Sequence, residues 1–154
     1  MKCLSIMEPF ATLIAMNEKK IETRSWKTNY RGKLAIHASK NINKDSKQYC
    51  LKNDYIKILK DKYVIINENN KVQYNFDFGH IIATCDLIDC VQMKELHEDY
   101  AIIENGMKVI GNELEFGGYE PGRYAWILDN IKMLDKPIEA KGQLGIWNYN
   151  EIFI

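Results

Sequence analysis

The sequence lacks a net charge, a long apolar run and any paired cysteine motif. Its 21 Lys and Arg residues balance 21 Asp and Glu residues, so binding to nucleic acid would need a local basic patch. No window approaches the roughly eighteen apolar residues of a membrane helix. The start, MKCLSIMEPF, has no apolar run typical of a signal peptide. We therefore expect a cytoplasmic protein that does not associate with membranes.

Motifs for metals, cofactors and nucleophiles are also absent. The four cysteines are scattered, at Cys3, Cys50, Cys85 and Cys90. This spacing predicts reduced, mostly buried thiols. The three histidines are equally dispersed, at His37, His80 and His97. There is no phosphate-binding glycine loop and no nucleophile elbow, so we expect neither a metal nor a cofactor.

The hydrophobic pattern predicts an α+β fold in which residues 1–154 form one domain. About five or six short strands are expected, at 4–6, 21–26, 33–39, 79–91, 123–134 and near the C-terminus. Helices are expected at 8–20, 43–60 and 93–100. Residues 67–75 are typical of an exposed loop, and residues 102–122 are rich in loops. The strands do not alternate regularly with helices, so a small, partly closed β-barrel with two or three helices packed around it fits best.

The most unusual stretch is NEKKIETRSWKTNYR at 17–31, which gathers basic and aromatic residues in a neutral chain. On a strand, Glu22, Arg24 and Trp26 would share one face, with Lys19 at the preceding turn. Such a face can stack on a base and hydrogen-bond its edge. It can also hold a Lys–Glu pair whose partners shift each other's pKa. The alternative is a solvated strand face with weak ion pairs.

Further basic and aromatic residues flank this stretch. The turn at 28–32 could join strands 21–26 and 33–39 into a hairpin. Lys27, Arg31 and Lys33 flank this turn, and Lys40 and Lys44 follow the strand at 33–39. These residues could line a groove for phosphates or form a solvated basic turn. Trp126 and Trp147 are expected to pack in the core, because Trp is highly buried on average.

The segment LSIMEPFATLIAMNEKKIETRSWKTNYRGKLAIHASK resembles the N-terminal half of an ASCH domain, the activating-signal-cointegrator homology domain of the PUA-like superfamily. The family signature G-x-K-x-x-E-x-R corresponds to NEKKIETR, which matches Lys19, Glu22 and Arg24. Asn17 replaces the glycine, and Asn tolerates the left-handed conformation that such a turn needs. The C-terminal GRYAWILDNIKMLDKPIEAKGQLGIWNY is similar to the closing strands of these domains. The middle, at about 41–120, is variable.

The resemblance implies a PUA-like β-barrel with a cleft beside the first helix, lined by Lys19 and its motif. It implies binding of RNA, another single-stranded nucleic acid or a nucleoside. Trp26 or Tyr30 would stack on a base, and Glu22 would accept a hydrogen bond from a base amino group. Phosphate contacts would come from Arg24, Arg31 and Lys40.

The resemblance also leaves an enzyme possible. Some small members of the family look like amidohydrolases of N4-acylated cytidine, and others like nucleases, with the motif lysine catalytic. That lysine would be Lys19, with Glu22 beside it. Those hydrolases carry Thr where this chain has Glu22, and a carboxylate there raises the pKa of the lysine, opposite to what a base requires.

Two points stay open at this stage. The downstream carboxylate of such an enzyme would be one of Glu95, Glu98 and Glu104. A small-molecule sensor or a protein-interaction module is a third function, because a fold does not fix a function. A mainly apolar cleft, with Glu22 and Arg24 paired to each other, would favour that third function.

Overall fold

The computed structural model describes residues 1–150, which form a mixed α+β fold. Ten strands are found there, more than the five or six predicted: β1 (Lys2–Ile6), β2 (Ile21–Arg24), β3 (Gly32–Ala38), β4 (Val64–Ile66), β5 (Val72–Tyr74), β6 (His80–Leu96), β7 (Tyr100–Ile103), β8 (Lys108–Ile110), β9 (Tyr124–Glu139) and β10 (Ile146–Asn148). The helices are α1 (Phe10–Ala15), α2 (Lys44–Tyr49), α3 (Asn53–Leu59) and α4 (Gly111–Glu115). The predicted strand near the C-terminus is β10; its sequence continues into residues 151–154, which lie outside the described residues.

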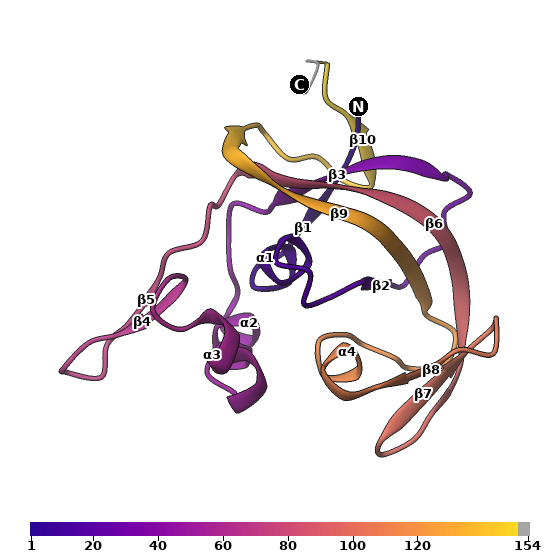
Figure 1. Cartoon of the computed structure of the whole chain (residues 1–154), viewed down its shortest axis with the longest axis horizontal. Helices are drawn as coiled ribbons and strands as arrows, with labels where there is room; N and C mark the ends of the chain where they lie inside the picture. The colour runs from indigo at the N-terminus through magenta and orange to yellow at the C-terminus, as the bar shows by residue number, and fades with distance from the viewer. Residues whose placement is uncertain (151–154) are drawn as a thin grey trace.

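One large sheet organises the molecule. Its strand order is β10-β1-β3-β6-β7-β8, and β9 pairs with both β6 and β2. The strands β6 and β9 pair along most of their length, and the register shifts at three places between Ile81 and Asp89. Such shifts bend a sheet, and Figure 1 shows β6 and β9 curving over α1. Within residues 1–150 the strand pairs branch and do not form the closed ring of a complete barrel.

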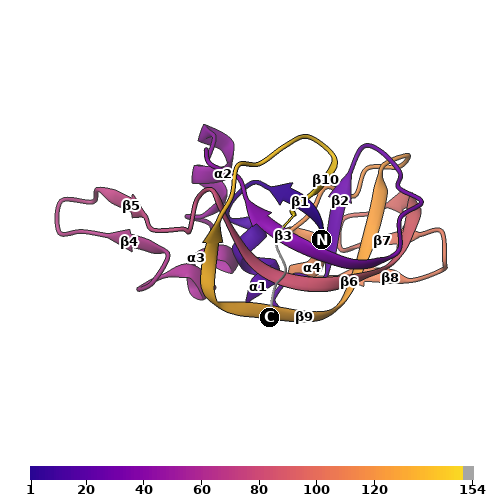
Figure 2. The same cartoon turned by 90° about the horizontal axis from the view of Figure 1, so that it is seen from above.

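Helix α1 lies under the concave side of this sheet (Figures 1 and 2). Ala11 and Ile14 belong to the same buried cluster as side chains of β1, β3, β6 and β9. Leu13, on the other side of the helix, packs with residues of α3 and the segment that follows it. The helix ends at Ala15, and two residues later Asn17 has a left-handed φ of 64°, as the resemblance led us to expect. The chain then turns directly into β2.

The predicted hairpin of 21–26 with 33–39 is wrong. The β2 strand pairs with β9, with Glu22 opposite Trp126, whereas β3 lies between β1 and β6. The β2 strand also ends at Arg24, before Trp26. Long-range pairing therefore overrides the local turn signal, since β9 offers β2 a buried partner strand.

The predicted helix at 93–100 is also wrong. Residues up to Leu96 continue β6, and this part of the strand pairs with β7. Met93 and Ile103 lie opposite each other and are both buried. Burial of these apolar side chains against a second strand outweighs the helical preference of the polar residues between them.

The middle of the chain contains more structure than its composition indicated. The expected loop at 67–75 includes β5, which forms a hairpin with β4 that extends away from the body in Figures 1 and 2. The expected helix at 43–60 is two helices, α2 and α3. Tyr55 and Leu59 are buried as predicted, but Tyr49 and Leu51 are exposed. The loop-rich 102–122 includes β8 and α4.

Two other predictions are confirmed. All four cysteines are free and buried, and both Trp126 and Trp147 are buried in the core. None of the helices in residues 1–150 has the length and apolar character needed to cross a membrane.

Candidate functional site

A cavity of about 530 Å³ opens beside α1 and β2. Three predicted residues, Glu22, Arg24 and Trp26, line it. The other lining residues lie in or next to β1, α1, β2, β3, α2 and α3, and in the segment from the end of α4 to the start of β9. They are Ser5, Ile6, Met7, Phe10, Thr23, Ser25, Ser39, Tyr49, Tyr55, Glu115, Phe116, Gly117, Gly118 and Arg123. We call this space the first cavity. Its volume is in the range of about 300–1,000 Å³ that small-ligand sites occupy.

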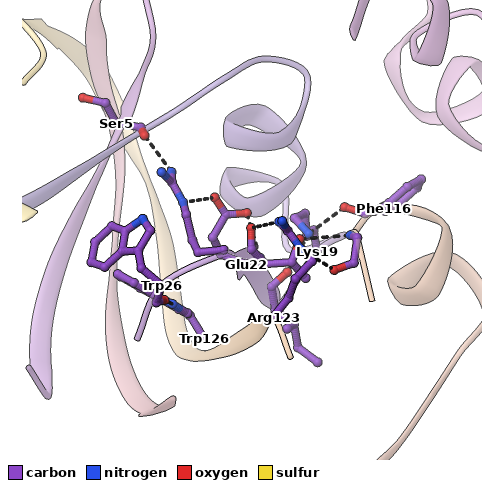
Figure 3. A network of polar contacts seen from close by, with 11 residues as sticks. Ser5, Lys19, Glu22, Trp26, Phe116, Arg123 and Trp126 are labelled. Atoms are coloured by element: carbon purple, nitrogen blue, oxygen red, sulfur yellow. Dashed lines mark hydrogen bonds and ion pairs between the residues drawn. The ribbon is translucent and has the colours of Figure 1, made fainter. Parts of the chain in front are cut away.

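Lys19 lies behind the wall of the first cavity. Its side chain is only 1% exposed, and the residue does not line the cavity. The Nζ atom donates hydrogen bonds to the carbonyl oxygens of Ile21 and Phe116, each at 2.6 Å (Figure 3). Burial lowers the pKa of Lys19, and the carboxylates of Glu22 and Glu113 oppose that shift. The lysine therefore ties the start of β2 to the segment after α4.

Glu22 and Arg24 form an ion pair inside the cavity. The Nε atom of Arg24 is 3.1 Å from a carboxylate oxygen of Glu22, and Nη2 donates to the carbonyl of Ser5 at 2.8 Å (Figure 3). A guanidinium carries five N–H donors, so further donors of Arg24 make no hydrogen bond within residues 1–150. Glu22 is 6% exposed. The pair is thus held in place with part of its hydrogen-bonding capacity unused.

Trp26 provides an aromatic surface at the same cavity. Its ring lies edge-on to the ring of Trp126, with centroids 4.8 Å apart and an interplanar angle of 85°. The indole Nε1 of Trp126 donates to the carbonyl oxygen of Trp26 at 3.3 Å. Trp126 is fully buried, whereas Trp26 is 36% exposed. A core residue therefore fixes the position of an exposed indole, and Figure 3 shows the two rings next to each other.

A further wall of the first cavity comes from the segment between α4 and β9, which the sequence reasoning did not identify. The amide of Gly118 donates to Thr23 Oγ1 at 3.0 Å, and Nε of Arg123 donates to the carbonyl of Gly118 at 3.1 Å. A Cβ on Gly117 would lie 2.7 Å from the ring of Tyr119 and 2.9 Å from the methyl of Thr23. The glycine pair followed by an arginine was the signal that could have indicated this wall.

Tyr30 and Arg31, both predicted to contact nucleic acid, line neither this cavity nor the second one described below. The hydroxyl of Tyr30 donates to the carbonyl of Lys33 at 2.5 Å. Arg31 donates to the carbonyl of Thr28 and pairs with Asp89 at 3.5 Å. These contacts hold the turn before β3.

The three candidate downstream carboxylates also lie away from the cavity. Glu95, Glu98 and Glu104 are exposed and line neither cavity. Glu113 in α4 is the acidic residue that the fold brings to the motif. Its carboxylate accepts hydrogen bonds from the amides of Lys20 and Ile21, at 2.7 and 3.3 Å, and burial raises its pKa.

A second cavity, of about 700 Å³, adjoins the first. The two share Ser5, Arg24 and Ser39. The predicted phosphate contact Lys40 lines the second cavity, together with His37, Phe78, Gly79, His80, Glu139, Ala140, Lys141, Gly142, Gln143, Leu144 and Gly145. No group of three or more His, Cys, Asp or Glu side chains gathers as metal ligands would in the part of the chain that the structure describes.

Comparison with known proteins agrees with the resemblance. The chain is similar to activating signal cointegrator 1 of Homo sapiens, with 32% identity over 100 residues, which is 64% of this chain and 16% of that protein. The Mus musculus protein of the same name is 31% identical over 98 residues, again 64% of this chain and 16% of the relative. The match thus spans about one sixth of the length of these relatives. The family model of the ASCH domain matches residues 4–138, and the chain therefore belongs to the ASCH domain family.

Proposed function

We propose that this ASCH domain binds single-stranded nucleic acid, RNA in the first place, and holds one nucleobase in the first cavity. The observation that carries the proposal is the position of Trp26. Its exposed indole is fixed by Trp126 at the cavity that Glu22 and Arg24 also line. A fixed aromatic face beside a hydrogen-bonding pair suits an unstacked base, whose face and edge are both available. Membership of the ASCH family supports RNA as the ligand.

The chemistry of the lining matches a base of either natural or modified type. The carboxylate of Glu22 can accept a hydrogen bond from an exocyclic amino group. The unused donors of Arg24 and Arg123 can reach ring nitrogens or carbonyl oxygens. Phe10 and Phe116 supply apolar surface that excludes water around these bonds. A PUA-like scaffold is part of the same proposal, since the curved sheet over α1 leaves the cavity beside that helix.

An amidohydrolase of N4-acylated cytidine, or a nuclease, is the alternative function, with Lys19 catalytic and Glu22 beside it. The lowered pKa of Lys19 favours it, because a neutral amine can act as a base or a nucleophile. The geometry favours it less, because Nζ contacts two backbone carbonyls and Lys19 does not line the cavity. Deacetylation of N4-acetylcytidine can be measured by chromatography of the product. We expect no turnover. Turnover that disappears in Lys19→Ala would replace the binding function with a hydrolase.

A sensor or protein-interaction module would be favoured by a mainly apolar cavity and by a pairing of Glu22 with Arg24, and only the second of these is found. Glu22 and Arg24 do pair with each other. The cavity, however, also contains Thr23, Ser25 and Arg123, so polar groups form much of its lining. A nucleobase uses such groups better than an apolar partner would.

The proposed function is tested by fluorescence anisotropy with a labelled single-stranded RNA of about twelve nucleotides at about 50 and 200 mM salt. We expect binding that weakens with salt. Trp26→Ala should weaken it by about 5- to 150-fold, since base–aromatic stacking contributes roughly 1–3 kcal/mol. Tyr100→Ala is the matched control, because Tyr100 lines neither cavity. No binding at either salt concentration would overturn the proposal.

A further inference from the structure

The second cavity differs from the first in its charge. Three of its lining residues, Arg24, Lys40 and Lys141, are cationic, and Glu139 is acidic. Within residues 1–150, Lys40 and Lys141 make no ion pair, whereas Arg24 pairs with Glu22 on the side of the first cavity. Two lysines against one carboxylate leave this concave surface with an excess of positive charge, which attracts an anion.

The backbone on both sides of this cavity is anchored. The amide of Ser39, next to Lys40, donates to the carbonyl of Ile6 at 3.0 Å. The amide of Ala140, next to Lys141, donates to the carbonyl of Gly79 at 3.1 Å. Both lysines therefore extend from fixed positions, although their side chains are exposed.

A buried polar chain supports the loop that carries Lys141. The Nε2 atom of His37 lies 2.8 Å from the carbonyl oxygen of Ala140, and Nδ1 lies 3.0 Å from Ser5 Oγ. A carbonyl only accepts, so Nε2 carries the proton. Burial lowers the pKa of His37, so the ring is neutral and Nδ1 accepts from the Ser5 hydroxyl. Trp147 Nε1 donates to the same hydroxyl oxygen at 3.1 Å.

Gly142 completes this support. A Cβ at this position would lie 2.8 Å from both Ser5 Oγ and the Cε1 atom of His37, so the loop backbone sits directly on the pair. Ser5 also lines both cavities. The loop therefore rests on a residue that lines both spaces.

We propose that the second cavity holds the sugar-phosphate backbone of the nucleotide next to the base in the first cavity. The ligand is then a nucleotide chain rather than a free nucleoside. Arg24 lies at the junction of the two cavities and carries donors for the phosphate between the two nucleotides. Lys40 and Lys141 neutralise the next phosphate. This inference rests on the proposed function and specifies its ligand class.

The test compares the double variant Lys40→Ala/Lys141→Ala with the wild type on the same labelled RNA. Each phosphate contact contributes roughly 0.7 to the slope of log affinity against log salt for single strands. We expect the slope to fall by about 0.7 to 1.4, and the affinity to fall by roughly tenfold at low salt. The control is Lys57→Ala/Lys71→Ala, which removes the same charge from exposed positions outside both cavities and should leave the slope unchanged.

Competition with free nucleosides provides the second measurement. A mixture of the four nucleosides, at the same nucleotide concentration as the RNA, should not displace it. Full displacement would overturn the inference, and so would a double variant with the wild-type affinity and slope. In either case a loss of binding in Trp26→Ala would leave the proposed function intact. If the wild type binds no RNA at all, the proposed function fails first.

Discussion

The two cavities share Ser5, Arg24 and Ser39, yet they are built in different ways. The first is backed by buried groups that satisfy one another, with Lys19 bonded to two carbonyls and Glu22 paired to Arg24. The second presents exposed lysines on anchored backbone. Buried, paired groups fix geometry, whereas exposed charges supply attraction that salt screens. In the function that we propose, the first cavity would therefore select the base and the second would supply affinity for the chain.

Removing the support behind the first cavity should have the largest effect. Lys19→Met keeps an apolar chain of similar length but removes the donor to the carbonyls of Ile21 and Phe116. Each unsatisfied buried acceptor costs about 1–3 kcal/mol, so we expect the loss of both donors to lower the free energy of unfolding by about 2–6 kcal/mol in urea denaturation. Lys20→Met is the control, because Lys20 is exposed. Equal stability of Lys19→Met and wild type would show that Lys19 does not hold the wall.

A buried carboxyl that is hydrogen-bonded to helix α1 makes the fold sensitive to pH. Glu8 is fully buried, and burial raises its pKa from 4.5 to about 7. The native state therefore holds this proton more tightly than the unfolded chain, and the stability that it contributes is lost as pH rises from about 4.5 through 7. We expect the free energy of unfolding to decrease by about 3 kcal/mol over this window.

Glu8→Gln isolates that contribution. The amide keeps an acceptor for the Thr12 N–H, which Glu8 binds at 2.7 Å, but it does not titrate. Between pH 4.5 and 7.5, the free energy of unfolding of Glu8→Gln should therefore rise relative to that of the wild type by about the same 3 kcal/mol. If the difference in free energy of unfolding between variant and wild type does not change with pH, burial does not raise the pKa of Glu8.

A change in the loop that lines the second cavity should lower the stability of the protein less than the loss of Lys19 does. Gly142→Ala places a Cβ against Ser5 Oγ and His37 Cε1, so the loop must shift. Overpacking of this kind costs about 1–3 kcal/mol, to be measured by thermal unfolding. The variant should also bind RNA more weakly with a smaller salt slope. Gln73→Ala, at an exposed position outside both cavities, is the control. A stable Gly142→Ala with unchanged binding would show that the loop position does not matter.

The smallest effect is expected from the buried hydroxyl of Tyr119. Within residues 1–150, the buried hydroxyl of Tyr119 is a polar side-chain group without a hydrogen-bond partner. Tyr119→Phe removes it, and replacing an unpaired buried polar group is close to neutral or favourable. We expect the stability to rise by up to about 1 kcal/mol in urea denaturation. A loss of stability would show that the hydroxyl has a partner when the protein is in solution.

Local features of the site could be predicted because they depend on neighbours in sequence. The spacing of Lys19, Glu22 and Arg24 predicted the motif, and the left-handed turn at Asn17 followed from the signature. The wall formed by the segment between α4 and β9 could not be predicted in this way. Phe116 and Arg123 reach the motif through a segment about a hundred residues away, and no local pattern reports such a contact.

Strand partners were predicted least well. The turn chemistry at 28–32 indicated a hairpin, and the polar residues at 93–100 indicated a helix, yet β2 and the end of β6 pair with β9 and β7. Both errors have one cause. Pairing across the sheet buries apolar side chains such as Met93, and that gain exceeds local preferences.

The sequence by itself determined the α+β class, the family motif, the buried cysteines and the aromatic residue that the first cavity uses. Those properties follow from side-chain chemistry and short spacing. Only the tertiary structure decided that Lys19 lies behind the wall, that Tyr30 and Arg31 support a turn, and that Lys40 and Lys141 line one cavity. Each of these depends on which distant segments pack together, because burial and charge proximity are properties of the folded chain.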